Sequence, residues 1–259
     1  MSVRTIRIET ARDGIATVTL DRPDKHHAMN AAMIAELTEA AATLGGDPAV
    51  RAVVLAATGP SFCAGGDLEW MRAQAAADRA GKIAEAGRLS AMLAALNALP
   101  KPLIARVQGN VYGGGLGLVA VSDIAIGADT IKLALTETRL GLIPATIGPF
   151  VVRRMGQGLA RQVFFSGTSF GADFALRAGL LHEVCPADRL DEQVRRQTEA
   201  VLKTAPGAVA AAKALCLSIG TDETRDIESS IAALADRWET DEAQDRIRAF
   251  LGQERRGSA

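Results

Sequence analysis

Short apolar runs rich in β-branched residues alternate with helical patterns through the first two-thirds of the chain. The runs at residues 50–58, 101–109 and 123–135 indicate buried strands. Helical patterns occupy residues 31–44 and 76–99, between these strands. Neighbouring parallel strands need a crossover connection, which is usually a helix. The alternation therefore predicts an α/β fold with mostly parallel strands.

The two ends of the chain depart from this alternation. TIRIET and IATVTL flank Asp13-Gly14, and this arrangement predicts a β-hairpin before the first helix. Asn30 is the expected N-cap of that helix, and Gly45 marks its expected end. After about Phe164 the strand signals fade, and helical patterns cover residues 190–205, 207–219 and 226–238. We therefore expect a mainly helical C-terminal part.

Composition argues against several classes of protein. The 259 residues carry 29 Lys and Arg against 30 Asp and Glu, so the excess of basic charge typical of nucleic-acid binding is missing. We find neither an apolar run of membrane-spanning length nor a secretory signal at the N-terminus. Cys63, Cys185 and Cys216 are far apart, without metal-ligand or disulfide spacing. A cytoplasmic protein without a metal site is expected.

Two glycine-rich turns each stand between a predicted strand and a predicted helix. They are CAGGD at residues 63–67 and YGGGLG at residues 112–117. A helix N-terminus presents unpaired N–H groups, and glycine lets the backbone approach a ligand oxygen. Two such turns that meet would form an oxyanion hole, and the alternative is that both turns serve packing only. Neither has the spacing of a dinucleotide or P-loop motif, and the chain lacks G-x-S-x-G and H-E-x-x-H.

Glu137 is the carboxylate with the most unusual surroundings. LALTETRLGLIPA places it between an apolar strand and an apolar turn. It is either a solvated residue at the start of a helix or a desolvated carboxylate whose raised pKa suits proton transfer.

The motifs together resemble the crotonase superfamily, the enoyl-CoA hydratases and isomerases, over essentially the whole chain. In chain order they are VTLDRPDKHHAMN, SFCAGGDLEWM, VQGNVYGGGLGLVAVSDIAIGAD, LTETRLGLIPATIGPFVVRRMG and SFGADFALRAGLLHEVCP. The resemblance implies a spiral of β-β-α turns at residues 1–195, followed by a helical trimerisation region at residues 196–259. It also implies homotrimers that can pair into hexamers, and an acyl-CoA substrate. No separate cofactor is expected, because coenzyme A is part of the substrate.

The resemblance also assigns roles to individual residues. The N–H groups of Gly66 and Gly114 would receive the thioester oxygen and stabilise an enolate, with Glu137 as the general acid and base. Lys25, His26 and Ala28 would surround the adenine, Asp67 and Leu68 would flank the pantetheine, and Ala64 and Gly117 would also contact the substrate.

Other notable residues receive structural interpretations. The pair His26-His27 lies in the CoA loop, so packing or a phosphate-side contact is preferred over proton transfer. Asp123 occupies the position of a structural aspartate of the family. Cys63 is expected to be a pocket wall and not a nucleophile, and Trp70 a wall of the acyl pocket or part of the core.

Gly117 is the main departure from the family pattern. Typical hydratases of this family use two glutamates, and the first of them maps onto Gly117. The chain most resembles bacterial methylglutaconyl-CoA hydratases, in which Gly117 would leave room for a substrate with a second carboxylate. Arg139, Arg153 and Arg154 are candidate cations for that carboxylate, but a surface or subunit-contact role is preferred for them. The alternatives are a Δ3,Δ2-enoyl-CoA isomerase that uses Glu137 alone, and an acyl-CoA-binding protein without activity.

Overall fold

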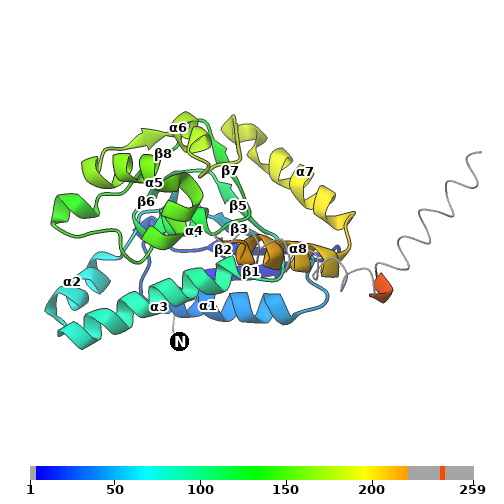
Figure 1. Ribbon diagram of the computed structural model, residues 1–259, viewed down its shortest axis with the longest axis horizontal. Helices are drawn as coiled ribbons and strands as arrows, with labels where there is room; N and C mark the ends of the chain where they lie inside the picture. Colours follow the sequence, from blue (N-terminus) through cyan, green and yellow to red (C-terminus); the bar gives the residue numbers. More distant parts are fainter. Residues whose placement is uncertain (1–3, 221–239, 243–259) are drawn as a thin grey trace, which may run out of the picture.

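A six-stranded sheet forms the centre of the computed structural model, which describes residues 4–220 and 240–242 (Figure 1). Its strand order is β1-β2-β3-β5-β7-β10. The first two strands form the predicted antiparallel hairpin, and every later pair in the sheet is parallel. The prediction of an α/β fold with mostly parallel strands is therefore confirmed. The strands are β1 (Ile6–Thr10), β2 (Ile15–Leu20), β3 (Ala52–Ala57), β5 (Leu103–Val107), β7 (Ile124–Ala128) and β10 (Glu183–Cys185).

A smaller sheet with the order β4-β6-β8-β9 lies beside the first. Its strands β4, β6 and β8 are parallel neighbours, and each follows directly on a strand of the large sheet. The chain thus repeats a path of two strands and a helix, one strand in each sheet, as the predicted spiral requires. The small sheet consists of β4 (Ser61–Cys63), β6 (Asn110–Tyr112), β8 (Lys132–Ala134) and β9 (Phe170–Gly171).

Helices cover both sheets. Asn30 caps α1 as predicted, because its side chain accepts a hydrogen bond of 2.9 Å from the N–H of Met33. The helices are α1 (Ala31–Gly46), α2 (Leu68–Ala76), α3 (Arg79–Asn97), α4 (Gly114–Ala120), α5 (Gly148–Ser166), α6 (Ala172–Arg177), α7 (Leu190–Leu202) and α8 (Pro206–Ser218), with short 3₁₀ turns η1 (Pro23–Lys25), η2 (Glu137–Leu140) and η3 (Ala187–Arg189).

The predicted helix at residues 76–99 is two helices. α2 ends at Ala76, and Asp78 caps a new helix by accepting a 2.7 Å hydrogen bond from the N–H of Gly81. The part after Phe164 is mainly helical as predicted, and two short strands that the sequence did not indicate, β9 and β10, also follow it. These strands have only two and three residues, too few for an alternating pattern to be visible.

The C-terminal helices are confirmed as far as the structure describes them. α7 and α8 match two of the three predicted segments, and the third, at residues 226–238, lies outside the described residues. The predicted boundary after residue 195 falls within α7, so the division at that point stays a prediction. Asp123 accepts hydrogen bonds of 2.7 Å from the N–H of Leu103 and from Lys213 of α8, which confirms its structural role.

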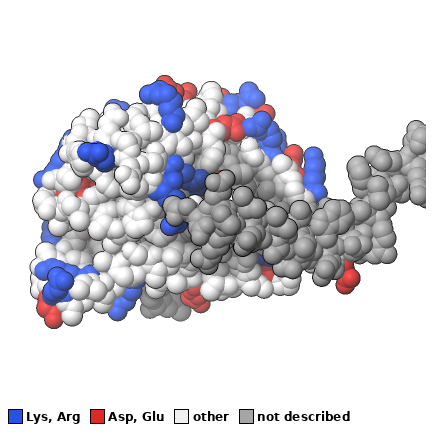
Figure 2. All heavy atoms as spheres, viewed as in Figure 1, with Lys and Arg blue, Asp and Glu red and all other residues white. Residues whose placement is uncertain are grey.

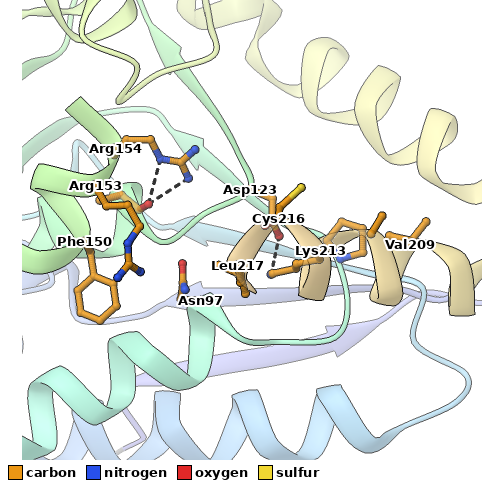
Figure 3. Close-up of a pocket in the computed structure, with 12 residues that line it drawn as sticks. Asn97, Asp123, Phe150, Arg153, Arg154, Val209, Lys213, Cys216 and Leu217 are labelled. Carbon is orange, nitrogen blue, oxygen red and sulfur yellow. Dashed lines mark hydrogen bonds and ion pairs between the residues drawn. The ribbon is translucent and has the colours of Figure 1, made fainter. Parts of the chain in front are cut away.

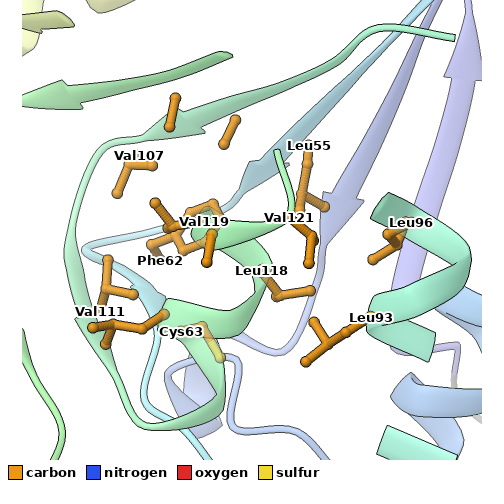
Figure 4. Packing of buried hydrophobic residues seen from close by; sticks show 14 of the residues in the cluster. Leu55, Phe62, Cys63, Leu93, Leu96, Val107, Val111, Leu118, Val119 and Val121 are labelled. Atoms are coloured by element: carbon orange, nitrogen blue, oxygen red, sulfur yellow. The ribbon is translucent and has the colours of Figure 1, made fainter. Parts of the chain in front are cut away.

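α4 lies inside the hydrophobic core. Its residues from Gly115 to Ala120 are all buried. Figure 4 shows Leu118 and Val119 packed among Leu55, Phe62 and Leu93. Each large apolar side chain buried in this way contributes about 1.5–3 kcal/mol to folding, so the position of α4 is strongly fixed.

No single helix in the described ranges is long and apolar enough to cross a membrane. The bent pair Ala187–Leu202 and Pro206–Ser218, which meets at 106°, passes that test only when both helices are counted together.

Candidate active site

Three turns meet at one edge of the small sheet. They follow β4, β6 and β8, whose carboxyl ends lie side by side because these strands are parallel neighbours. A Cβ added to Gly65 would lie 3.6 Å from the Cα of Gly113. A Cβ added to Gly113 would lie 3.5 Å from Oε1 of Glu137. The two glycine-rich turns therefore contact each other, and the second one also contacts the carboxylate of Glu137.

Glycine is needed where the two turns touch. Gly65 and Gly113 have φ angles of +91° and +46°, which residues with a side chain rarely adopt. A side chain on Gly65 would also press against the carbonyl oxygen of Tyr112, at 3.2 Å. These two glycines set the backbone path that turns the following residues, Gly66 and Gly114, toward the cleft.

The neighbouring backbone hydrogen bonds hold both turns but do not use the N–H groups of Gly66 and Gly114. Met29 pairs with both sides of Gly66, because its N–H donates to Gly65 and its carbonyl accepts from Asp67, at 2.7 and 2.9 Å. Gly114 is the first residue of α4, so its N–H has no partner within the helix. Within residues 4–220 and 240–242, neither N–H donates a hydrogen bond. Two free donors on adjacent turns are the elements of an oxyanion hole.

Glu137 opens η2 directly after the third strand of the small sheet. Its Oε2 is buried and has no hydrogen-bond partner in the described part of the chain. Burial raises the pKa of this carboxyl above its usual value. A desolvated carboxylate with an unpaired oxygen suits the transfer of a proton to or from a bound molecule.

A cleft of about 660 Å³ opens in front of these groups. Its walls come from α2, α3 and the three turns, and they are mostly apolar. Six of the apolar lining residues are Met29, Ile34, Trp70, Met71, Leu89 and Leu142. Such a cavity suits an apolar chain whose reacting end lies at the two glycine turns.

A groove of about 410 Å³ adjoins the cleft. The two share Ala64, Gly66 and Leu68, so a ligand can extend from one into the other past the Gly66 N–H. Every predicted substrate contact except Gly117 lies in this groove, namely Lys25, His26, Ala28, Ala64, Asp67 and Leu68.

The floor of the groove is held by Asp67. Its carboxylate pairs with Arg22 at 2.9 Å and caps α2 by accepting a 2.8 Å hydrogen bond from the N–H of Glu69. Burial alone would raise the pKa of Asp67, but the hydrogen bonds from Arg22, Glu69 and Trp70 lower it overall. Asp67 is thus a fixed anion that shapes the groove.

The histidine pair divides into two environments. His27 is fully buried, and its Nδ1 accepts a 3.0 Å hydrogen bond from the N–H of Arg22. Its Nε2 therefore carries the proton and donates to the carbonyl of Thr58 at 2.6 Å. His26 is exposed in the groove, with Nδ1 2.9 Å from Oγ of Ser61. The packing interpretation is confirmed for His27.

Trp70 forms part of the cleft wall, whereas Cys63 lies in the hydrophobic core and lines neither the cleft nor the groove, which corrects the prediction that it is a pocket wall. Cys63 is fully buried, with its Sγ 3.2 Å from the carbonyl of His27, and burial raises the pKa of its thiol to about 12. The prediction that it is not a nucleophile agrees with this environment, because the thiolate is the reactive form. Trp70 lines the cleft, and its Nε1 donates a 3.1 Å hydrogen bond to Glu85 of α3.

Gly117 does not line the cleft, which corrects the prediction that it contacts the substrate. A Cβ at this position would lie 2.8 Å from Cγ2 of Ile147 and 2.9 Å from Cδ1 of Leu93. The space beside Gly117 is thus filled by the protein's own side chains. Its missing side chain lets α4 pack closely and leaves no room for a ligand.

The three candidate arginines also lie elsewhere. Arg153 and Arg154 line a separate cavity of about 610 Å³ between α5 and α8 (Figure 3). There Arg154 donates hydrogen bonds of 3.1 and 3.0 Å to the carbonyl of Ala120. Arg139 packs against Gly167.

Lys82 of α3 lines the active-site cleft, although no sequence motif marks it as a site residue. The spacing of Lys82, Ala86 and Leu89 places them on one face of the helix, but the sequence does not show which face meets a cavity. Across the described residues, no cluster of His, Cys, Asp and Glu side chains suits a metal ion.

Comparison with known proteins identifies the family of this chain. Residues 10–256 match the model of the enoyl-CoA hydratase/isomerase family. The crystal structure of an enoyl-CoA hydratase from Shewanella pealeana superposes with a TM-score of 0.92 at 34% identity, covering 96% of this chain and 94% of that one. Pseudomonas aeruginosa AtuE also gives 0.92, at 36% identity over 96% of this chain and 97% of its own. The 2,3-dehydroadipyl-CoA hydratase of Escherichia coli K12 is 30% identical over 243 residues, which are 90% of this chain and 92% of the relative. The chain therefore belongs to the enoyl-CoA hydratase/isomerase family and has its crotonase fold.

Proposed function

We propose that this protein is a hydratase that adds water to a 2-enoyl-CoA thioester, with branched glutaconyl-CoA thioesters such as 3-methylglutaconyl-CoA among its substrates. One observation carries the proposal: two turns with unpaired N–H groups contact each other and the carboxylate of Glu137, whose buried Oε2 has no partner among the described residues. The arrangement offers both an acceptor site for a thioester oxygen and a group that moves protons.

The proposed reaction uses these groups in order. The thioester oxygen accepts hydrogen bonds from the N–H groups of Gly66 and Gly114. Glu137 takes a proton from a water molecule, whose oxygen bonds to C3 of the substrate. The electrons of the double bond shift toward the thioester, and the enolate oxygen is stabilised by the two N–H donors. The protonated Glu137 then delivers its proton to C2, so the elements of one water molecule are added.

The substrate's coenzyme A would lie in the groove. Lys25 and His26 line this groove, where they would contact the phosphates and the adenine, and Ala64 and Leu68 line both the groove and the cleft. The reaction needs no separate cofactor, since the acyl-CoA brings its own carrier. A homotrimeric or hexameric assembly and a cytoplasmic location belong to the same proposal and rest on the family resemblance.

An isomerase is the second candidate, and a specific observation favours it. In the described part of the cleft Glu137 is the one lining carboxylate, and the position of the family's first glutamate is Gly117. A lone carboxylate can remove a proton from C2 of a 3-enoyl-CoA and return it at C4. That reaction shifts the double bond into conjugation and requires no water.

A substrate panel separates the candidates. Crotonyl-CoA, 3-methylglutaconyl-CoA and 3-hexenoyl-CoA would be followed by the absorbance of the conjugated enoyl thioester. A hydratase lowers the absorbance of the first two, whereas an isomerase raises it only with the third. Conversion of none of them, together with tight binding of butyryl-CoA, would indicate an inactive binding protein and contradict both proposals.

A variant pair tests the role of Glu137. Glu137→Gln should lose at least about 100-fold in kcat, the usual contribution of a general acid or base, while butyryl-CoA still binds. The matched control is Glu39→Gln, which changes an exposed glutamate on α1 and should leave kcat unchanged. Full activity of Glu137→Gln would refute the mechanism.

A further inference from the structure

The active-site cleft contains a cation that the proposed chemistry does not use. Among the described residues that line it, Lys82 is the one cation and Glu137 the one carboxylate. Lys82 lies in the first turns of α3, on the same face as Ala86 and Leu89, which also line the cleft. The remaining wall on this side is formed by α2 with Trp70 and Met71. Lys82 is exposed, and its charge on the wall of a largely apolar cavity suits a ligand that carries a negative group.

The acidic neighbours of Lys82 on α3 are already engaged. Glu85 accepts the 3.1 Å hydrogen bond from Trp70 and forms an ion pair with Arg88. Asp78 accepts from the N–H of Gly81 as the cap of the helix. Lys82 itself forms no ion pair within the described ranges. Its ammonium group is therefore available to a ligand in the cleft.

The location of Lys82 separates it from the groove in which coenzyme A is proposed to bind. The cations that line the groove are Lys25 and Arg72, and Lys82 is absent from its lining. Lys82 lines only the cleft, which receives the acyl chain when the thioester oxygen lies at Gly66 and Gly114. Figure 2 shows Lys, Arg, Asp and Glu side chains at the end of the molecule formed by α2 and the start of α3, next to an area of other residues.

We infer that Lys82 binds a carboxylate at the far end of the acyl chain, so that the preferred substrates are CoA thioesters of dicarboxylic acids. The inference rests on the proposed function only in that the cleft must bind the acyl chain of an enoyl-CoA. Lys82 thereby takes the role of carboxylate partner that the sequence suggested for Arg139, Arg153 and Arg154, because those arginines lie outside the cleft and Lys82 lines it. A lysine suits this position because its apolar stem packs along the wall while its ammonium group reaches the carboxylate.

Binding of unreactive thioesters tests the inference without turnover. Adipyl-CoA and hexanoyl-CoA have acyl chains of equal length and differ in the terminal carboxylate. Dissociation constants would be measured by calorimetry for the wild type, Lys82→Met, Lys82→Arg and the control Lys132→Met, an exposed lysine on β8. The wild type should bind adipyl-CoA about five- to tenfold more tightly than hexanoyl-CoA, as expected for an ion pair that becomes partly buried on binding.

The variants decide between a specific and a general role of the charge. Lys82→Met should lose the preference for adipyl-CoA while its affinity for hexanoyl-CoA stays within twofold of the wild type. Lys82→Arg should keep most of the preference, and Lys132→Met should keep all of it. An equal loss of affinity for both thioesters would place Lys82 on the coenzyme A and overturn the inference, as would an unchanged preference in Lys82→Met.

The hydration assay then separates this inference from the proposed function. Hydration of 2-hexenoyl-CoA without any preference for 2,3-dehydroadipyl-CoA would overturn the role of Lys82 and leave the hydratase intact. A Lys82-dependent binding preference in a protein that hydrates neither thioester would support Lys82 and contradict the hydratase.

Discussion

Gly117→Ala is expected to destabilise the protein, although alanine is the better residue for a helix. Alanine gains about 0.5–1 kcal/mol over glycine in a helix interior. The added Cβ, however, would lie 2.8 Å from Cγ2 of Ile147 and 2.9 Å from Cδ1 of Leu93, well inside the normal contact distance of about 3.5–4.0 Å between carbon atoms. Both neighbours are buried, at 1% and 0% exposure, so neither can move into solvent.

The size of the destabilisation of Gly117→Ala follows from these two opposing effects. Overpacking of a filled core costs about 1–3 kcal/mol, which exceeds the gain in helix propensity. We therefore expect a net loss of about 1–2 kcal/mol in the free energy of unfolding. For a chain of this size, such a loss lowers Tm by roughly 2–8 °C.

The matched control is Gly87→Ala on α3. Gly87 is also helical, but a Cβ there would meet no atom within 4 Å. Its replacement should raise Tm by roughly 1–4 °C, which is the propensity gain alone. Thermal unfolding followed by circular dichroism measures both variants. A rise in Tm for Gly117→Ala similar to that of Gly87→Ala would refute the packing argument and restore the idea of an open space at Gly117.

A double-mutant cycle identifies the contact responsible. Leu93→Ala alone should cost about 2–5 kcal/mol, because it leaves a cavity beside α4. In the double variant with Gly117→Ala, the new Cβ partly fills that cavity and no longer meets Cδ1. The double variant should therefore lose less unfolding free energy than the two single variants lose together.

Three further predictions concern the site and its supports. Because burial raises the pKa of Glu137, kcat/KM should fall with decreasing pH already above the usual range of a glutamate. The same shift means that the folded protein binds the proton of Glu137 more tightly than the unfolded chain does. The stability of the wild type relative to Glu137→Gln should therefore fall as pH rises from the usual pKa of a glutamate to the raised pKa of Glu137. Measurements of Tm for both proteins at several pH values test this. Asp67→Ala should lower the unfolding free energy by about 2–4 kcal/mol in urea titrations, because it removes the cap of α2 and leaves the mostly buried Arg22 unpaired. The exposed Cys216 should react with a thiol reagent in the native protein, whereas the buried Cys63 should react only after unfolding.

Local sequence signals sufficed for the glycine turns and for the large sheet apart from its last strand, β10. The strands of the large sheet from β3 to β7 are apolar runs of five or six residues, which is long enough for their pattern to be clear. The turns could be recognised because glycine clusters stand between such runs and helices. Strands β4 and β6 have three residues each and carry no pattern of their own, so the small sheet that brings the turns together could not be predicted from periodicity. The break at Asp78 was hidden because an alanine-rich segment favours helix on both sides of it.

Gly117 and Lys82 show why the site itself could not be predicted from the sequence, because the surroundings of both residues depend on how the helices pack. The sequence shows that Gly117 has no side chain, but it does not show what occupies the space beside it. Ile147 lies thirty residues away in the chain, and only the packing of α4 under the start of α5 brings it there. Lys82 presents the opposite problem, since its charge is evident in the sequence while the wall that it joins depends on how α3 packs against α2. A substrate carboxylate would therefore be selected by a cation on the helical wall of the cleft, and the glycine on α4 would affect selectivity only through the position of that helix.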